Sequence, residues 1–88
     1  MEYNMNFGQA IEAAKTGKKI QRAGGNGKGP YVELATCISY VKAEGEVVNA
    51  DHMAIGSQAL AFVGTSGVQL GWLASQSDML ANDWRVVE

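Results

Sequence analysis

The segment at residues 71–84 constrains the fold of this chain more than any other part of the sequence. It contains both tryptophans, and between them Ser75 and Asp78 stand in the S-x-x-[DE] spacing of a helix capping box. In such a box the serine hydroxyl accepts a backbone N–H, while the acid accepts the N–H of the serine. A carboxylate also suits the positive end of the helix dipole. The segment therefore predicts a short helix that begins after Ser75 and ends at residues 82–83.

A second capped helix is predicted near the N-terminus. Asn6 stands in the N-cap position, and Gln9 follows at the third helical position in the manner of a capping box. Gly17 is placed to end the helix in a left-handed conformation. The apolar residues between them recur at i, i+3, i+4 and i+7 and form one stripe, which consists of Phe7, Ala10, Ile11 and Ala14.

The rest of the chain reads as short strands separated by turns. Alternating or apolar runs predict strands at residues 19–22, 31–36, 38–42, 46–48, 59–63, 68–70 and 84–87. Glycine-containing turns at 43–45 and 64–67 predict two hairpins, while residues 49–57 show no regular pattern. This order predicts a single α+β domain over residues 1–88. It has an N-terminal helix, a mainly antiparallel sheet with hairpins, and a short C-terminal helix before the last strand.

Size and composition limit the classes of protein to consider. A chain of 88 residues has a small core, and its 47% hydrophobic content is enough for self-association to add buried surface. No run approaches the roughly 20 apolar residues of a membrane span, and the N-terminus lacks the pattern of a signal peptide. The single Cys37 cannot form an internal disulfide, which suits a reducing cytoplasm, and we expect it to be buried in a strand.

Charge is distributed unevenly along the chain. The net charge of −2 argues against a broad DNA or RNA surface, which would need a basic excess. Residues 1–28 nevertheless carry five Lys and Arg residues against two Glu, and the remainder is acidic. A local basic region on an acidic protein suits a small anion. The alternative is that these lysines are ordinary solvated charges near a helix end.

The glycine-rich loop at residues 24–29 invites comparison with phosphate-binding loops. It is not a Walker loop, because Gly29 follows Lys28 and a strand, not a helix, comes next. Repeated glycines can still present backbone N–H groups to an anion, and Lys28 adds a point charge. The competing interpretation is a flexible turn. Arg22, which enters the loop, has either a phosphate or one of the later acids as its partner.

The two tryptophans have different predicted roles. Trp84 opens the terminal strand and is assigned to the core, whereas Trp72 precedes a helix N-terminus, where it offers a flat platform beside free N–H groups. Asp78 either only caps the helix or also accepts hydrogen bonds from a ribose or a base amine. Catalysis gains little support, because His52 stands beside Asp51 without a nucleophile or further metal ligands at suitable spacing. We therefore expect neither an enzyme nor a metal site.

Three blocks of the sequence resemble one protein family. The segment GWLASQSDMLANDW at 71–84 resembles the G/P-W-L-A-S-Q-T-D-M-L-A-x-D-W ending of the second Thoeris anti-defence family, small phage proteins that defeat a bacterial defence system. The runs MNFGQAI at 5–11 and RAGGNGKG at 22–29 resemble the other two blocks of that family, whereas residues 31–58 match poorly. The resemblance implies a homotetramer in the cytoplasm of the infected bacterium. It would sequester a cyclic nucleotide signal, of the glycocyclic ADP-ribose type or a cyclic oligonucleotide, without cleaving it.

Carried onto this chain, the resemblance implies a ligand site without a cofactor, and pockets between subunits are expected. Its residues are Arg22, Gly25, Asn26, Gly27, Lys28, Trp72, Ala74, Ser75, Asp78 and Met79. One departure concerns Gly25, where relatives usually carry tryptophan. This departure has three interpretations. The protein has lost affinity for the usual signal, or another aromatic residue (Tyr31, Tyr40 or Phe62) supplies the stacking face in place of the tryptophan. In the third, the smaller side chain widens the pocket, which then admits a larger cyclic nucleotide. Two alternatives remain: a protein–protein inhibitor of a defence protein that uses the acidic later part, and a signal-degrading enzyme.

Overall fold

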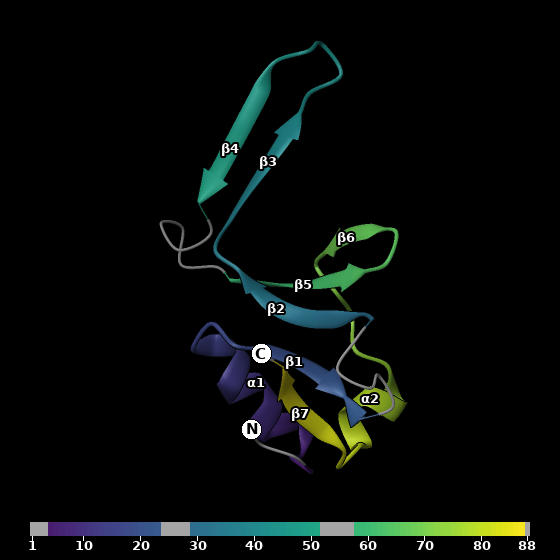
Figure 1. Ribbon diagram of the computed structural model, residues 1–88. Coiled ribbons are helices and arrows are strands. Elements are labelled where there is room, and N and C mark those ends of the chain that lie inside the picture. Colours follow the sequence, from purple (N-terminus) through teal and green to yellow (C-terminus); the bar gives the residue numbers. More distant parts are fainter. Residues whose placement is uncertain (1–3, 24–28, 52–57, 88) are drawn as a thin grey trace.

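The computed structural model describes residues 4–23, 29–51 and 58–87. Along the chain it contains α1 (Phe7–Lys15), β1 (Lys19–Arg22), β2 (Tyr31–Ala35), β3 (Cys37–Val41), β4 (Val47–Asp51), β5 (Ala59–Gly64), β6 (Gly67–Leu70), α2 (Gln76–Leu80) and β7 (Trp84–Val87) (Figure 1). The predicted α+β domain is confirmed, with its N-terminal helix, antiparallel hairpins and short helix before the last strand.

Five strands form one sheet in the order β6-β5-β2-β1-β7, and every neighbouring pair is antiparallel. Along its outer edge β7 also meets the N-terminal segment, where Met5 and Trp84 exchange backbone hydrogen bonds. The sheet therefore joins the two ends of the described chain. This arrangement brings the residues before α1, the end of β1 and the region of α2 into one neighbourhood.

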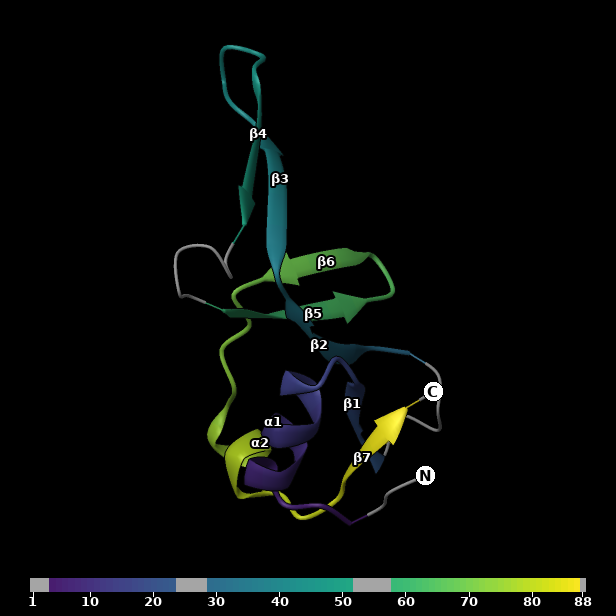
Figure 2. The same ribbon diagram turned by 90° about the vertical axis from the view of Figure 1, so that its left-hand side faces the viewer.

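Strands β3 and β4 form a separate two-stranded sheet, which we call the arm (residues 37–51). The arm projects away from the body of the molecule (Figures 1 and 2). The Cα radius of gyration is 14.2 Å, against about 12 Å for a compact domain of this length. The longest principal extent is 45 Å, because the arm extends the molecule in that direction.

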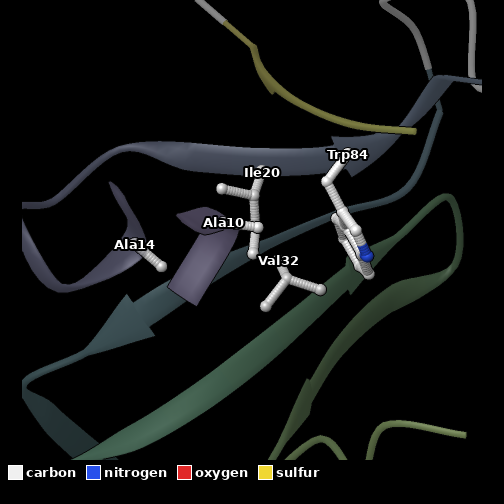
Figure 3. Close-up of a cluster of buried hydrophobic side chains, with 5 residues drawn as sticks. All are labelled: Ala10, Ala14, Ile20, Val32 and Trp84. Carbon is white, nitrogen blue, oxygen red and sulfur yellow. The ribbon is translucent and has the colours of Figure 1, made fainter. Parts of the chain in front are cut away.

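One face of the five-stranded sheet is covered by α1. Ala10 and Ala14 of the helix are fully buried against Ile20, Val32 and Trp84 of three strands (Figure 3). The helix begins as predicted, since the side chain of Asn6 accepts the N–H of Gln9 and the Gln9 side chain accepts that of Asn6. It is also terminated as predicted, because Gly17 has a φ of +95°, which glycine adopts without steric cost. These contacts make the helix, not the arm, the centre of the core.

Three local predictions are wrong. Cys37 is exposed, because it stands at the start of β3, where the chain leaves the main sheet and enters the two-stranded arm. Residues 49–51 belong to β4, where they pair with β3. Helix α2 ends at Leu80, not at residues 82–83, since Ala81 already has extended angles of −73° and 150°. His52 and the rest of the segment 52–57 lie outside the described residues.

Candidate functional site

A cavity of about 190 Å³ opens where β1 and β2 diverge. The two strands pair at Ile20 and Val32, and beyond this point the Gln21 side chain bridges them by donating to the carbonyl of Pro30 at 2.9 Å. The cavity occupies the space that the missing strand pairing leaves. Its walls consist of Gln21, Arg22, Pro30, Tyr31, Val32, Phe62, Trp72, Asp78 and Trp84.

An aromatic cluster forms one wall of the cavity. Trp72 and Trp84 meet edge to face with ring centroids 6.2 Å apart, and Phe7 packs against both at 6.4 and 5.7 Å. Trp84 is only 2% exposed, and its indole N–H donates to the carbonyl of Asp78 at 2.9 Å. Its predicted place in the core is confirmed. Trp72 is half-buried, so it has one side on the core and another on the cavity.

The polar wall is built around Arg22. Its Nε donates to Oδ1 of Asp83 at 2.5 Å, one terminal nitrogen lies 3.4 Å from Oδ2 of the same carboxylate, and the other lies 3.3 Å from Oδ1 of Asp78. The hydrogen bond with Asp83 is the main reason that the pKa of Arg22 is raised further. The later acids predicted as one possible partner of Arg22 are therefore in place, as Asp83 and Asp78. The guanidinium keeps two N–H groups that these bonds do not use.

Asp78 connects this wall to helix α2. Its Oδ2 accepts the backbone N–H of Ser75 at 3.0 Å and the Ser75 hydroxyl at 2.9 Å, while the N–H of Asp78 donates to that hydroxyl at 3.2 Å. The predicted capping box is thus confirmed. Burial alone would raise the pKa of Asp78, but the bonds from Ser75 and Arg22 outweigh it, and the pKa lies below its ordinary value. The carboxylate is ionised at neutral pH and is held in one orientation.

The charge of this polar wall bears on the prediction that Arg22 binds a phosphate. One guanidinium faces two carboxylates, Asp78 and Asp83, so the three groups together are negative. A phosphate placed against them would meet repulsion as well as attraction. Hydroxyl and amino groups of a ligand suit these carboxylates better, since an ionised carboxylate is purely an acceptor.

The structure brings together part of the predicted site. Arg22, Trp72 and Asp78 line the cavity, and Ser75 orients Asp78 without lining it. Ala74 and Met79 belong to the same segment but are not among the lining residues. The predicted residues Gly25, Asn26, Gly27 and Lys28 lie outside the described residues, so their role stays a prediction. Arg22 and Pro30, which flank that segment in the sequence, both line the cavity.

Of the aromatic residues considered as substitutes for the missing loop tryptophan, two are in place. Tyr31 and Phe62 line the cavity, whereas Tyr40 lies on the arm and does not. Gln21, Pro30 and Val32 also line the cavity, although no motif in the sequence marks them as site residues. Their position beside the glycine-rich loop was the one signal that could have identified them.

Two features associated with other classes of protein are absent from the described part of the chain. No group of three or more His, Cys, Asp or Glu side chains within residues 4–23, 29–51 and 58–87 is arranged to hold a metal ion. In the same part of the chain, no helix has the length and apolar character needed to traverse a bilayer.

Comparison with known proteins identifies the family. The sequence profile of the Thoeris anti-defense 2-like domain matches residues 5–87. Thoeris anti-defense 2 of Bacillus phage SP01 is 33% identical over 92 aligned residues, which cover 99% of this chain and 99% of the relative. Both matches extend through the arm and the segment around residues 31–58, where the sequence blocks gave little resemblance. The chain therefore belongs to the Thoeris anti-defense 2-like family, whose name assigns it to phage anti-defence.

Proposed function

We propose that this protein acts in the cytoplasm of an infected bacterium, where it binds a cyclic nucleotide immune signal and sequesters it without cleaving it. The family membership supports a role against the Thoeris system. The observation that carries the binding proposal is the cavity at the divergence of β1 and β2. It combines aromatic faces with a fixed carboxylate and a guanidinium. This combination suits a ligand that is flat at one end and rich in hydroxyl groups elsewhere.

The walls of the cavity match the parts of a nucleotide. Trp72 and Phe62 offer ring faces or edges for a base, a contact worth about 1–3 kcal/mol per stacked base. Asp78 can accept a base amine or a ribose hydroxyl, because it is ionised and held in one orientation. The phosphates of the ligand would lie away from the carboxylates of Asp78 and Asp83, because charges of the same sign repel. The sequence places Lys28 and the glycines before it at the same end of the sheet, between Arg22 and Pro30.

The size of the cavity indicates that one described chain does not enclose such a ligand. Its volume of about 190 Å³ is below the roughly 300–1,000 Å³ typical of ligand sites. A base fits this volume, whereas the remaining sugar and phosphate groups need further contacts. In this proposal the glycine-rich loop and residues of a second subunit would provide them, in a homo-oligomer that is a tetramer by resemblance to the family. Light scattering that shows a monomer at micromolar concentration would contradict this part of the proposal.

Holding the ligand, not breaking it, agrees with the chemistry of the polar wall. Both carboxylates are bound to Arg22, and the pKa of Asp78 is lowered, which makes it a poor general base at neutral pH. Sequestration needs only tight binding with slow release. The alternatives are a signal-degrading enzyme and an inhibitor that binds a defence protein directly.

One experiment separates the three functions. The protein is incubated with glycocyclic ADP-ribose isomers and with cyclic di- and trinucleotides, washed by filtration and denatured, and the released molecules are identified by mass spectrometry. A sequestering protein returns the intact signal, an enzyme returns fragments, and an inhibitor of a defence protein takes up none. Trp72→Ala should abolish uptake. Leu80→Ala, at a residue of α2 that is 75% exposed and away from the cavity, is the matched control and should retain it.

A further inference from the structure

The strand pairing between β1 and β2 ends at a proline. The register of this antiparallel pair places Ile20 opposite Val32, so its continuation would place Arg22 opposite Pro30. Proline has no backbone N–H and cannot donate a ladder hydrogen bond. The two strands diverge at this point, and the cavity of the proposed site lies between them. The sequence therefore determines where the cavity begins.

Gln21 replaces the missing ladder bond with bonds from its side chain. Its Nε2 donates to the carbonyl of Pro30 at 2.9 Å, and its Oε1 accepts a hydrogen bond from Nη2 of Arg85 at 2.9 Å. Arg85 stands opposite Gln21 in the pairing of β1 with β7, so these side chains link β7 and β1 to the start of β2 (Figure 1). Gln21 is 4% exposed and is the one buried polar side chain among the residues that the structure describes. Water therefore does not easily replace a bond that this amide loses.

An amide is chemically suited to both of these neighbours. The guanidinium of Arg85 is purely a donor and the carbonyl of Pro30 is purely an acceptor, so the group between them needs an acceptor on one side and a donor on the other. A carboxylate lacks the donor, and an ammonium group lacks the acceptor. The two neighbours therefore hold the amide of Gln21 in one orientation, with Nε2 towards Pro30.

The same bridge holds the two walls of the cavity. Ladder bonds keep neighbouring strands about 4.8 Å apart, whereas the glutamine side chain spans the wider gap beyond the last residue pair. Gln21 and Arg22 line the cavity from β1, and Pro30 and Tyr31 line it from the start of β2. A change in the amide of Gln21 would therefore shift one wall relative to the other.

We propose that Gln21 is a specificity-determining residue of the ligand site, because it holds the cavity walls at a separation that selects the base of the ligand by its size. This inference rests on the proposed binding of a nucleotide. A two-ring base reaches across more of the cavity than a one-ring base. It gains more contact from walls held at a fixed separation, and it loses more when one wall moves. The intact bridge therefore favours a purine over a pyrimidine.

The test uses AMP and UMP as probes, because they share the ribose and the phosphate and the ratio of their dissociation constants isolates the base. Titrations followed by heteronuclear NMR measure weak binding and show whether each variant is folded. Gln21→Glu keeps the side-chain length and the acceptor for Arg85 but removes the donor to Pro30. Gln21→Met keeps the length without either bond, and it decides the question if the buried carboxylate prevents folding. Val86→Ala, at a buried position of β7 that is not among the lining residues, is the control for lost stability.

We expect the unmodified protein to bind AMP about fivefold more tightly than UMP, and both Gln21 variants to reduce this preference to less than about twofold. Val86→Ala should retain the preference. Folded Gln21 variants that keep it, or a Val86→Ala variant that loses it to the same extent, would overturn the inference. An unmodified protein that binds AMP and UMP equally or not at all, yet returns an intact cyclic nucleotide in the uptake experiment, would overturn base selection by Gln21 and leave the proposed function standing. A protein that takes up neither class of compound would overturn both.

Discussion

Trp84 is the residue for which the effect of a substitution on the free energy of unfolding can be predicted most quantitatively. The indole is 2% exposed, contacts Phe7 and Trp72, and donates a hydrogen bond to the carbonyl of Asp78. Removing such a side chain to alanine costs about 3–5 kcal/mol. A domain of 88 residues has a free energy of unfolding of roughly 4–13 kcal/mol, so at the lower end of this range the alanine variant would leave little stability to measure. Trp84→Phe is therefore the better perturbation.

The expected loss for Trp84→Phe follows from two contributions. The hydrogen bond to the carbonyl of Asp78 is worth about 0.5–1.5 kcal/mol net. The smaller ring leaves a cavity that adds about 1 kcal/mol. We therefore expect the free energy of unfolding to fall by about 2 kcal/mol. Trp72→Phe keeps a ring at a half-buried position and should cost less than about 1 kcal/mol, although it should weaken ligand binding.

Urea denaturation followed by far-UV circular dichroism measures both variants on one scale. The slope of the unfolding free energy against urea concentration should be unchanged, since neither substitution alters the surface exposed on unfolding. Equal losses for the two variants, or a larger loss for Trp72→Phe, would refute the division of the aromatic cluster into a core residue and a site residue.

The remaining predictions concern charge and the glycine-rich loop. Asp78→Asn should lower the free energy of unfolding by about 1 kcal/mol at neutral pH. Because the folded-state pKa of Asp78 lies below 3.8, this stability is present above pH 3.8 and is lost as the pH falls through the folded-state pKa. Urea titrations from pH 7 to 2.5 should show this loss for the unmodified protein and not for Asp78→Asn. Lys28→Ala should weaken signal binding in calorimetry by about 1.5–3 kcal/mol with an unchanged melting temperature, and equal losses of binding and stability would instead make the loop structural. Gly25→Trp should change the preference among cyclic ADP-ribose isomers and cyclic di- and trinucleotides in competition assays, and identical profiles would exclude a role for this position in selectivity.

Local sequence signals predicted the helices well because capping is a contact between near neighbours. Asn6 with Gln9, and Ser75 with Asp78, lie three residues apart, and the structure contains all four reciprocal bonds. The strands of the main sheet followed from alternation for the same reason. Residue patterns within one turn or one strand hold most of the information that fixes these elements.

The end of α2 and the partner of Arg22 could not be predicted from local patterns, because both are determined by tertiary contacts. Helix α2 ends early, and the chain then brings Asp83 to Arg22 and buries Trp84 in the core. The acid that would pair with Arg22 could not be chosen from seven candidates without the knowledge that β7 lies beside β1. Cys37 was assigned to the interior because its segment is apolar. Alternation cannot show whether a hairpin packs on another layer or projects from the molecule.

The two polar regions around the proposed site differ in charge, and this difference would orient a nucleotide. Arg22, Asp78 and Asp83 form a wall that is negative overall and is tied to the start of α2 and the start of β7. The basic residues of the chain concentrate before residue 29, and Lys28 stands two positions before Pro30, which lines the cavity. A nucleotide whose base and ribose hydroxyls approach the carboxylates keeps its phosphates away from them and close to that basic segment. The reverse orientation would set phosphates against two carboxylates that already share a single guanidinium. In the proposed complex, the carboxylates would therefore select the orientation of the ligand, and the aromatic cluster would supply most of its contact surface.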